Sequence, residues 1–421
     1  MPHTRDSPRL LLCLALLLNI PAVLGAQRSM SAGATVERAL SALRRNNDWT
    51  LSQQASICEI PAPPFKERQR AEEFARRLRA LGLQNVRIDG AGNVIAERPG
   101  VAARPLVVLS AHLDTVFPEG TDVRVRRTGD TLRGPGIGDN CRGLAVILAV
   151  ARTMRDQRVR TAGTLVFVAT VGEEGAGNLR GVRHLVDVEL RDRIDYFIAV
   201  DGGGQGVTSA AVGSIRYKAT FHGPGGHSYG AFGIANPIHA LGRAVARLAE
   251  LQVPTSPRTT FNVGVIGGGT SVNSIASEAW LDLDMRSASP VELQKLEAAA
   301  RAALDSAVAE ELARWPRSNV PLGVRIDTIG IRPAAAQPDT ARIVRTAVET
   351  GRAAGLSPRT SASSTDANYP MSRGIPSIEM DGGGSGQGSH SLEEIYVDGP
   401  YGYRGPQWVL RLVLALTASQ R

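Results

Sequence analysis

Four short apolar runs in this sequence are each followed, directly or after a loop, by a histidine or an acidic residue. The runs cover residues 106–110, 164–170, 196–200 and 377–380. Continuous apolar runs of this length predict strands buried on both faces, and a helical pattern over 141–155 separates the first two. We therefore expect an α/β fold whose mostly parallel sheet is covered by helices on both sides.

The side chains that follow these runs share metal-binding chemistry. They are His112, Asp114, Glu173, Glu174, Asp201 and His390. Ligands of open α/β sheets bind beyond the carboxyl ends of the strands, so we expect these residues to meet at one edge of the sheet. Asp139 is a further candidate, because it lies in the glycine-rich stretch 134–140 just before the helical pattern.

Imidazole and carboxylate ligands suit zinc, and also cobalt or manganese. Two metal ions about 3.5–4 Å apart require a bridging carboxylate with terminal ligands on each side. We therefore expect one metal at His112 and Asp201. The other belongs at Glu174 and His390, with Asp139 between the two. Each motif alone also suits a surface turn, and their occurrence at successive strand ends favours the metal interpretation.

Two further acids suit supporting roles. Strand alternation places Asp114 on the same side as His112, where its carboxylate can hold the second ring nitrogen. Glu173 and Glu174 are adjacent, so they cannot point the same way in an extended segment. One can bind metal while the other faces the water as general base.

Composition excludes several other classes. The chain has 421 residues, 43% of them hydrophobic and 21% charged, which is enough for about two folded domains. Scattered arginines carry most of its net charge of +8, and aromatic residues make up only 5%, so we expect no nucleic-acid partner. The glycine-rich stretch lacks the third glycine of a dinucleotide fingerprint and the lysine of a triphosphate-binding loop.

A different pattern begins near residue 212. Strands are expected over 215–221, 261–265, 279–285 and 324–329, with helices over 236–251 and 292–315. This pattern predicts an α+β unit inserted into the α/β domain. We therefore expect a catalytic domain formed by 34–211 and 330–421, interrupted by the inserted unit at 212–329. In the second catalytic part, Asp339 is expected to cap a helix that runs to Gly351.

The N-terminus has the layout of a secretory signal peptide. Arg5 and Arg9 precede the apolar run 10–18, and small residues follow near position 26. Residues 1–26 are therefore expected to be a signal peptide, and the mature protein to be periplasmic or secreted, with no stable membrane association. An uncleaved anchor is the alternative, although the run is short for a spanning helix of about 20 residues.

Cys58 and Cys141 remain once this leader is removed. Two cysteines do not form a disulfide framework, but they can pair in an oxidising compartment. Their spacing does not decide whether their Cα atoms lie close enough, so both states stay open.

At these residues the sequence resembles the M20 family of zinc metallopeptidases and deacylases, which includes peptidase T, carboxypeptidase G2 and aminoacylase-1. The resemblance spans roughly residues 35–420 and rests on motifs that occur in order. They lie at 110–115, 136–143, 173–174, 201, 222–228 and 382–394. It implies a zinc-exopeptidase-like catalytic domain and an inserted α+β (ferredoxin-like) lid domain, through which two copies of the chain can form a homodimer.

The resemblance also implies a role for each motif residue in the catalytic domain. Its zinc ligands would be His112, Asp139, Glu174, Asp201 and His390. Asp139 would be shared by both ions and followed by a cis peptide bond to Asn140. Glu173 would be the general base, and Asp114 the partner of His112.

Within the lid domain the resemblance implies three functional residues. His227 matches a histidine that polarises the scissile carbonyl, often from the partner subunit. Asn273 resembles a substrate-binding asparagine, and Arg286 an arginine that receives a substrate carboxylate. Structural alternatives remain: His227 and Asn273 suit turns, and Arg286 can pair at the surface with Asp282 or Asp284.

Within this family, aspartate at the position of Asp201 accompanies aminopeptidases and dipeptidases, and glutamate accompanies carboxypeptidases and deacylases. The resemblance therefore implies a di-zinc exopeptidase of the peptidase T-like branch, which hydrolyses short peptides with a free N-terminus through a metal-bridging hydroxide. An N-acyl-amino-acid deacylase or a carboxypeptidase is the alternative enzyme. A catalytically silent zinc-binding protein is the alternative without turnover, and the intact Glu173 argues against it.

Overall fold

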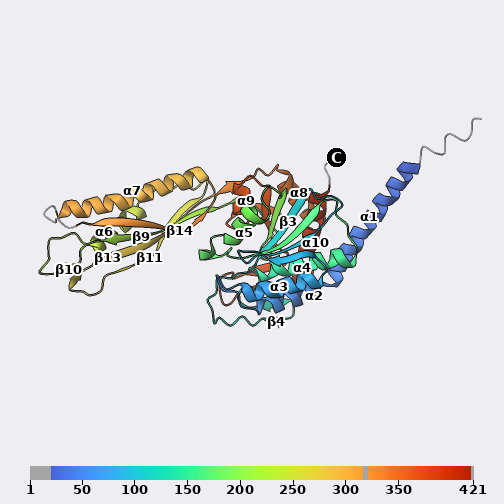
Figure 1. Cartoon of the computed structure of the whole chain (residues 1–421), viewed down its shortest axis with the longest axis horizontal. Helices are drawn as coiled ribbons and strands as arrows, with labels where there is room; N and C mark the ends of the chain where they lie inside the picture. The colour runs from blue at the N-terminus through green and yellow to red at the C-terminus, as the bar shows by residue number, and fades with distance from the viewer. Residues whose placement is uncertain (1–19, 316–320, 419–421) are drawn as a thin grey trace, which may run out of the picture.

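The computed structural model describes residues 20–315 and 321–418, with side chains from residue 33 onward. The expected signal peptide at 1–26 lies mostly outside the described residues. Figure 1 shows two parts: a broad α/β domain and an elongated second domain that extends away from it.

The α/β domain is built on one large mixed sheet. Its strands are β1 (Gln84–Ile88), β2 (Val94–Arg98), β3 (Leu106–His112), β6 (Thr164–Thr170), β7 (Tyr196–Val200), β8 (Gly206–Ala211), β15 (Ala335–Ala336), β16 (Arg359–Ser363) and β17 (Ser377–Met380). The order is β1-β2-β6-β3-β7-β17-β8-β15, with β16 beside β8. The central strands β6, β3, β7 and β17 run parallel, which confirms the mostly parallel sheet.

Helices cover both faces of this sheet. One face carries α1 (Ile20–Arg45), α2 (Asn47–Cys58), α3 (Arg68–Ala80), α4 (Cys141–Asp156), α8 (Arg342–Ala353) and α10 (Arg404–Thr417). The other carries α5 (Arg180–His184), the π-helical η2 (Leu185–Glu189) and α9 (Asn368–Ser372). Val107 and Leu109 of β3 enter the first core, whereas Leu106 and Val108 enter the second. Because side chains alternate across a strand, an unbroken apolar run fills both cores.

A small antiparallel sheet lies at the carboxyl end of the large one. It consists of β4 (Arg126–Thr128), β5 (Thr131–Arg133), β18 (Ser385–Gln387) and β19 (Ile395–Val397) in the order β18-β19-β5-β4. None of these strands was predicted. Their pairing brings the loop after β5, which contains Asp139, beside the β18–β19 hairpin, which carries His390.

The second domain is an antiparallel sheet backed by two helices. Its elements are β9 (Gly213–His222), α6 (Pro237–Ala249), β11 (Thr259–Gly268), β13 (Glu278–Ser287), α7 (Pro290–Arg314) and β14 (Gly323–Arg332). The strand order β11-β13-β9-β14, with one helix after β9 and one after β13, is ferredoxin-like. Strand β14 continues to Arg332, beyond the expected boundary at 329. The short pair β10 (Gly226–His227) and β12 (Ser274–Ile275) lies at the far end from the α/β domain (Figure 1).

The predicted cap of α8 was wrong. The helix begins at Arg342 after Ala341, and no side chain caps it. A turn closed by the Ala341 N–H on the Pro338 carbonyl, at 2.8 Å, separates Asp339 from the helix. Asp339 instead accepts a hydrogen bond from the hydroxyl of Thr360 at 3.4 Å.

Cys58 and Cys141 form a disulfide with their Cα atoms 5.5 Å apart. Both cysteines are fully buried. The bond joins the end of α2 to the start of α4, which settles the question that their spacing left open. Among the described residues, no helix has the length and apolar character needed to cross a membrane.

Candidate active site

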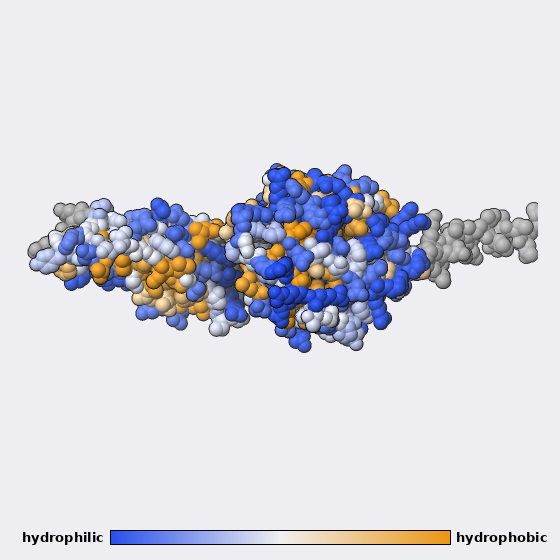
Figure 2. Space-filling model, turned by 90° about the horizontal axis from the view of Figure 1, so that it is seen from below, coloured by the Kyte–Doolittle hydropathy of each residue, from blue (hydrophilic) through white to orange (hydrophobic). Residues whose placement is uncertain are grey.

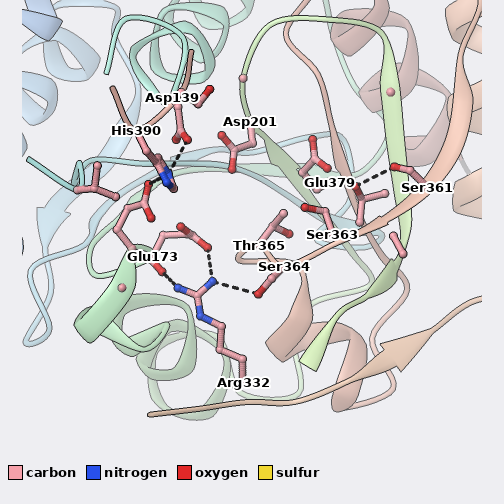
Figure 3. A pocket seen from close by; sticks show the side chains of 18 of the residues that line it. Asp139, Glu173, Asp201, Arg332, Ser361, Ser363, Ser364, Thr365, Glu379 and His390 are labelled. Carbon is pink, nitrogen blue, oxygen red and sulfur yellow. Dashed lines mark hydrogen bonds and ion pairs between the residues drawn. The ribbon is translucent and has the colours of Figure 1, made fainter. Parts of the chain in front are cut away.

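Five of the predicted metal-binding side chains meet at the carboxyl end of the large sheet. Nε2 of His112 lies 3.0 Å from Oδ1 of Asp139 and 3.6 Å from Oδ1 of Asp201. Nε2 of His390 lies 3.0 Å from Oε1 of Glu174 and 3.3 Å from Oδ2 of Asp139. Asp139 therefore presents one carboxylate oxygen to each histidine (Figure 3).

The loop that carries Asp139 is held by hydrogen bonds to its backbone. The Glu394 carboxylate accepts the N–H groups of Gly136, Gly138 and Asp139, at 2.9, 2.8 and 2.9 Å. Asn140 follows through a cis peptide bond, as expected. Its side chain accepts the Gly143 N–H at 3.0 Å, which caps α4, and donates to the last carbonyl of β7 at 2.9 Å. The loop is thus joined to the strand that precedes Asp201.

The expected contact between the Asp114 carboxylate and His112 needs correction. Nδ1 of His112 lies 3.0 Å from the backbone carbonyl oxygen of Asp114, whereas its carboxylate is 3.8 Å away. The carboxylate instead accepts the N–H groups of Glu173 and Glu174, at 3.1 and 2.8 Å. Strand β3 ends at His112, so the alternation used for the prediction does not extend to residue 114. Asp114 still fixes the His112 ring, but through its main chain.

The donor set fits a divalent metal ion. Nε2 of His112 is buried and forms no hydrogen bond, although two carboxylates lie within 3.6 Å of it. A buried polar atom without a hydrogen bond is costly unless another ligand takes its lone pair. Ligand atoms of His112, Asp139 and Glu174 all lie within 4.8 Å of one another. Nitrogen and oxygen donors that converge in this way suit a divalent metal ion such as zinc, so these residues are a candidate metal site.

The carboxylates around the two histidines favour their protonated forms. Burial opposes the charge on His112, but Asp201 and Asp139 outweigh it and raise its pKa well above the ordinary value. Hydrogen bonds to Asp139 and Glu174 raise the pKa of His390 to about 10. Burial would raise the pKa of Asp139, yet both histidines hold it well below its usual range. A metal ion would take the place of these protons.

Glu173 lies beside the cluster in an ion pair that was not predicted. Nη1 of Arg332 is 3.0 Å from its Oε1, and Nη2 donates to its backbone carbonyl (Figure 3). Burial is the largest effect on Glu173 and raises its pKa well above the ordinary value, although Arg332 opposes this. Arg332 is the last residue of β14, and no local pattern indicates that this strand end reaches the site.

Comparison with known proteins identifies the family. A sequence model of peptidase family M20/M25/M40 matches residues 108–414. The chain belongs to this family. Carboxypeptidase G2 of Pseudomonas sp. is 29% identical to it over 359 residues, 82% of each chain. A succinyl-diaminopimelate desuccinylase of Corynebacterium glutamicum is 27% identical over 242 residues, which cover 55% of this chain and 64% of the desuccinylase.

Solved structures share the fold. A tripeptidase of Staphylococcus aureus has a TM-score of 0.73 at 22% identity, over 87% of this chain and 98% of the tripeptidase. The aminopeptidase PepT of Bacillus cereus has a TM-score of 0.71 at 20% identity, over 88% and 98%. The YXEP protein of Bacillus subtilis, described as a dinuclear metal binding peptidase, has 0.66 at 16%, over 89% and 99%. The chain is thus a hydrolase of the M20 peptidase family with that family's two-domain fold.

The lid domain places its three predicted residues in different surroundings. Arg286 lines a cavity of about 740 Å³ next to the metal-binding cluster and pairs with Asp284 at 2.7 Å. His227 and Asn273 do not line this cavity. They are exposed and adjacent at the far end of the lid, where the Ser228 N–H donates to the Asn273 carbonyl at 2.9 Å. Of these three predicted lid residues, only Arg286 lies near the metal-binding cluster of its own chain.

Further acids of the M20 site were not predicted as ligand-binding groups. Glu379 and Asp381 line the same cavity, at and just beyond the end of β17. Asp366 is buried and accepts a hydrogen bond from the hydroxyl of Thr170. A glutamate inside an apolar run, as at 379, resembles an ordinary strand residue, so the sequence alone does not single it out.

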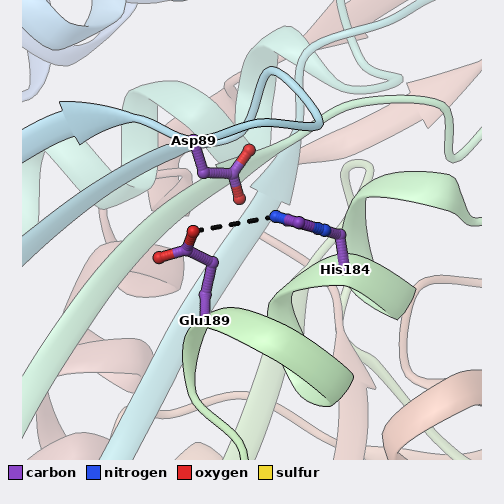
Figure 4. Close-up of side chains that lie close together, drawn as sticks. All are labelled: Asp89, His184 and Glu189. Atoms are coloured by element: carbon purple, nitrogen blue, oxygen red, sulfur yellow. Dashed lines mark ion pairs between the residues drawn. The ribbon is translucent and has the colours of Figure 1, made fainter.

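A second group of metal-capable side chains lies away from this cavity. Asp89, His184 and Glu189 have ligand atoms within 4.8 Å of one another (Figure 4). One oxygen of Asp89 accepts the backbone N–H groups of residues 91–93, each at 2.9 Å. Glu189 pairs with Arg87 at 2.9 Å. These contacts explain the group as an anchor for the turn between β1 and β2.

Proposed function

We propose that this M20 hydrolase is a di-zinc exopeptidase that cleaves short peptides with a free N-terminus. The placement of Asp139 carries the proposal, because its two oxygens lie 3.0 Å and 3.3 Å from ring nitrogens of His112 and His390. Two metal ions that share one carboxylate require this arrangement. Asp201 and Glu174 would complete the two sites, and cobalt or manganese would suit the same ligands.

Bound zinc ions would polarise the scissile carbonyl and lower the pKa of a water toward about 7. Glu173 lines the cavity, where it takes a proton during attack on the carbonyl and returns it to the leaving amine. Its raised pKa suits a group that must hold this proton between the two steps. Arg332 is a positioning residue, because its bonds to the side chain and main chain of Glu173 restrict where the carboxylate points.

The free-N-terminus preference is supported by Asp201, which matches the residue type of aminopeptidases and dipeptidases in the family. Similarity in fold to a tripeptidase and an aminopeptidase is consistent with it. Arg286 would receive the carboxylate of a short substrate, because it lines the cavity with its guanidinium partly exposed.

An N-acyl-amino-acid deacylase or carboxypeptidase is the second candidate. It is favoured by the 29% identity to carboxypeptidase G2 over 82% of both chains. The same Arg286 would then hold the carboxylate of the released amino acid. The two candidates differ in whether the substrate amine is free or acylated.

His227 and Asn273 would act across a homodimer. They stand at the far end of their own lid, so they would complete the cavity of a second copy. The lid carries exposed apolar side chains that such pairing would cover, and Figure 2 shows apolar surface along this domain. The exposed apolar side chains of the lid include Tyr229, Phe232, Val265, Ile266 and Val272. Polarisation of the scissile carbonyl by His227 would stabilise charge that develops in the transition state.

We also propose that the protein is exported and works in the periplasm or outside the cell. The signal-like N-terminus supports export. The disulfide between Cys58 and Cys141 also supports it, because such bonds persist in oxidising compartments.

The function is tested by mass spectrometry on the zinc-loaded chain from Gln27 onward. A free tripeptide and its N-acetylated twin are mixed, with Glu173→Ala as control. Release of the N-terminal residue from the free peptide alone supports the exopeptidase. Cleavage of the blocked twin would transfer the assignment to the second candidate. No cleavage of either, or equal cleavage by Glu173→Ala, would contradict the proposal.

A further inference from the structure

We infer that Glu379 and Asp381 form a binding site for a primary ammonium group of the substrate. We call this pair the acidic subsite. The inference rests on the proposed function, since it takes the cavity beside the metal-binding cluster to be the place where the substrate lies. It adds the substrate class: peptides that carry a cationic amine close to the scissile bond.

The acidic subsite continues the wall of the cavity that begins at Asp201. Glu379 and Asp381 are two positions apart, and both line the cavity. Figure 3 shows Glu379 on the wall that also carries Asp201. Glu379 lies opposite Ala199 of β7, and the Asp201 N–H donates to the Met380 carbonyl at 3.0 Å. Asp381 is therefore level with Asp201. Glu379 is set back by two residues, or about 7 Å along the strand.

The two carboxylates have no cationic partner among the described side chains. Glu379 is 7% exposed, and its hydrogen-bonding neighbour is the hydroxyl of Thr208. Asp381 accepts the backbone N–H of Gly206. Burial, followed by the like charges of Asp381 and Asp201, raises the pKa of Glu379 well above its ordinary range. A bound cation would offset both effects.

The arginines of the cavity do not fill this role. Arg216 and Arg286 pair with Asp284, at 2.9 and 2.7 Å. Arg332 pairs with Glu173 at 3.0 Å. None of these three guanidinium groups pairs with Glu379 or Asp381, so the acidic subsite has no cationic partner among the described arginines of the cavity.

The chemistry of the surrounding wall matches an ammonium group. Such a group has three N–H donors and one positive charge. The two carboxylates accept from it, and the hydroxyls of Thr208 and Ser361, 3.4 Å apart, supply further acceptors. Thr208 pairs with Glu379 on one side and Ser361 on the other in the sheet, so the acceptors adjoin one another.

Two groups of a peptide can supply this ammonium. The α-amino group is two bonds from the first carbonyl carbon, which suits Asp381 at the level of Asp201. The amino group of a lysine side chain is several bonds further away, which suits the deeper Glu379. Both groups would be recognised by the same hydrogen bonds and charge. They differ in how far the amine lies from the scissile carbonyl, and this difference distinguishes them in an experiment.

The test measures binding by calorimetry in the zinc-loaded Glu173→Gln chain, which holds peptide without turnover. The ligands are lysyl-glycyl-glycine and norleucyl-glycyl-glycine, each with a free and an acetylated α-amino group. Glu379→Gln and Asp381→Asn are compared with the charge-retaining Glu379→Asp. Glu189→Gln, which removes a carboxylate outside the cavity, is the matched control. Circular dichroism checks folding of each variant.

We expect Glu379→Gln or Asp381→Asn to weaken binding of amine-bearing peptides by about tenfold or more. Acetylated norleucyl-glycyl-glycine should change by less than about twofold, and Glu379→Asp should keep the preference. If only peptides with a free α-amino group lose affinity, the acidic subsite binds the α-amino group. If the acetylated lysyl peptide also loses affinity, the acidic subsite binds the lysine side chain. Equal effects on all four peptides, no effect, or no binding of any would overturn the inference.

Turnover of the same four peptides by the wild-type chain is measured separately. Cleavage of the peptides with a free α-amino group alone, together with unchanged binding in Glu379→Gln and Asp381→Asn, would remove the acidic subsite and leave the proposed function standing. Amine-dependent binding without cleavage would do the reverse. The two failures are therefore distinguishable.

Discussion

Asp139 illustrates how single residues of this site depend on backbone contacts far away in the sequence. Its loop is held by the Glu394 carboxylate, 258 positions from Gly136, through three N–H groups. The metal-binding candidates were predictable because each follows a strand or precedes a helix. Glu394 and Arg332 were not, because an isolated charged residue carries no spacing that indicates which distant loop it contacts.

Replacing Glu394 with glutamine should weaken zinc binding. The NH₂ group of the new glutamine side chain would face backbone N–H groups that now donate to the carboxylate oxygens of Glu394. The loop would lose these hydrogen bonds and would no longer hold Asp139 between the two histidines. We expect the affinity for zinc, measured by competition with a chromophoric chelator, to fall about 10–100-fold. The neighbouring Glu393, whose side chain is 81% exposed, provides the matched control Glu393→Gln. Equal affinities of the two variants would contradict the role given to Glu394.

Zinc binding should release protons at neutral pH. The pKa of His390 is raised to about 10 by Asp139 and Glu174, so its ring is protonated at pH 7 before metal binds. Zinc requires the neutral imidazole, so the apparent affinity should rise with pH until it nears that value. Calorimetry in buffers of different ionisation enthalpy measures the protons released. A heat of binding that is independent of the buffer would show that the histidines are already neutral.

At the scale of elements, burial decides what was predictable. Strands β6, β7 and β17 were predicted with the bounds they have, because a strand buried on both faces needs an unbroken apolar run. The three-residue strands β5, β18 and β19 contain no such run. Their pairing depends on tertiary contacts, yet it brings the His390 loop to Asp139. The elements that complete the site are therefore those with the weakest local pattern.

The disulfide should contribute to stability by restricting the unfolded chain. Cys58 and Cys141 are separated by 83 positions, and cross-links over long loops remove unfolded-state entropy. Replacing both with serine should lower the free energy of unfolding by about 2–5 kcal/mol, measured by urea denaturation at matched protein concentration. Identical denaturation midpoints for the oxidised wild type and the double variant would contradict this expectation.

At the scale of the whole molecule, the position of the lid determines which residues act together. Arg286 lines the cavity of its own chain, whereas His227 and Asn273 lie at the opposite end of the lid. The sequence resemblance implied all three as functional residues, but it did not show how far each lies from the metal-binding cluster. The distance of each lid residue from the cluster depends on how the ends of β9 and β14 pack against the α/β domain. No local sequence pattern indicates this packing.

Two inactive variants should restore activity when mixed, if His227 acts across a dimer. A mixed dimer of Glu173→Ala and His227→Ala has one cavity with an intact Glu173 and a partner that supplies an intact His227. Random exchange of subunits should give about a quarter of the wild-type activity. The rate is measured after the subunits have been mixed and allowed to re-associate. Mixtures that stay as inactive as the separate variants would place His227 in its own chain's site or outside catalysis.

Two metal ions per chain underlie the whole proposed chemistry, so counting them against activity is the most direct measurement. The chain is stripped with a chelator and zinc is returned in known amounts, while native mass spectrometry counts bound ions and tripeptide turnover is followed. We predict that turnover is lost on stripping and that its maximum coincides with two zinc ions per chain. Full turnover in the stripped chain, or saturation at a single ion, would contradict the shared role of Asp139.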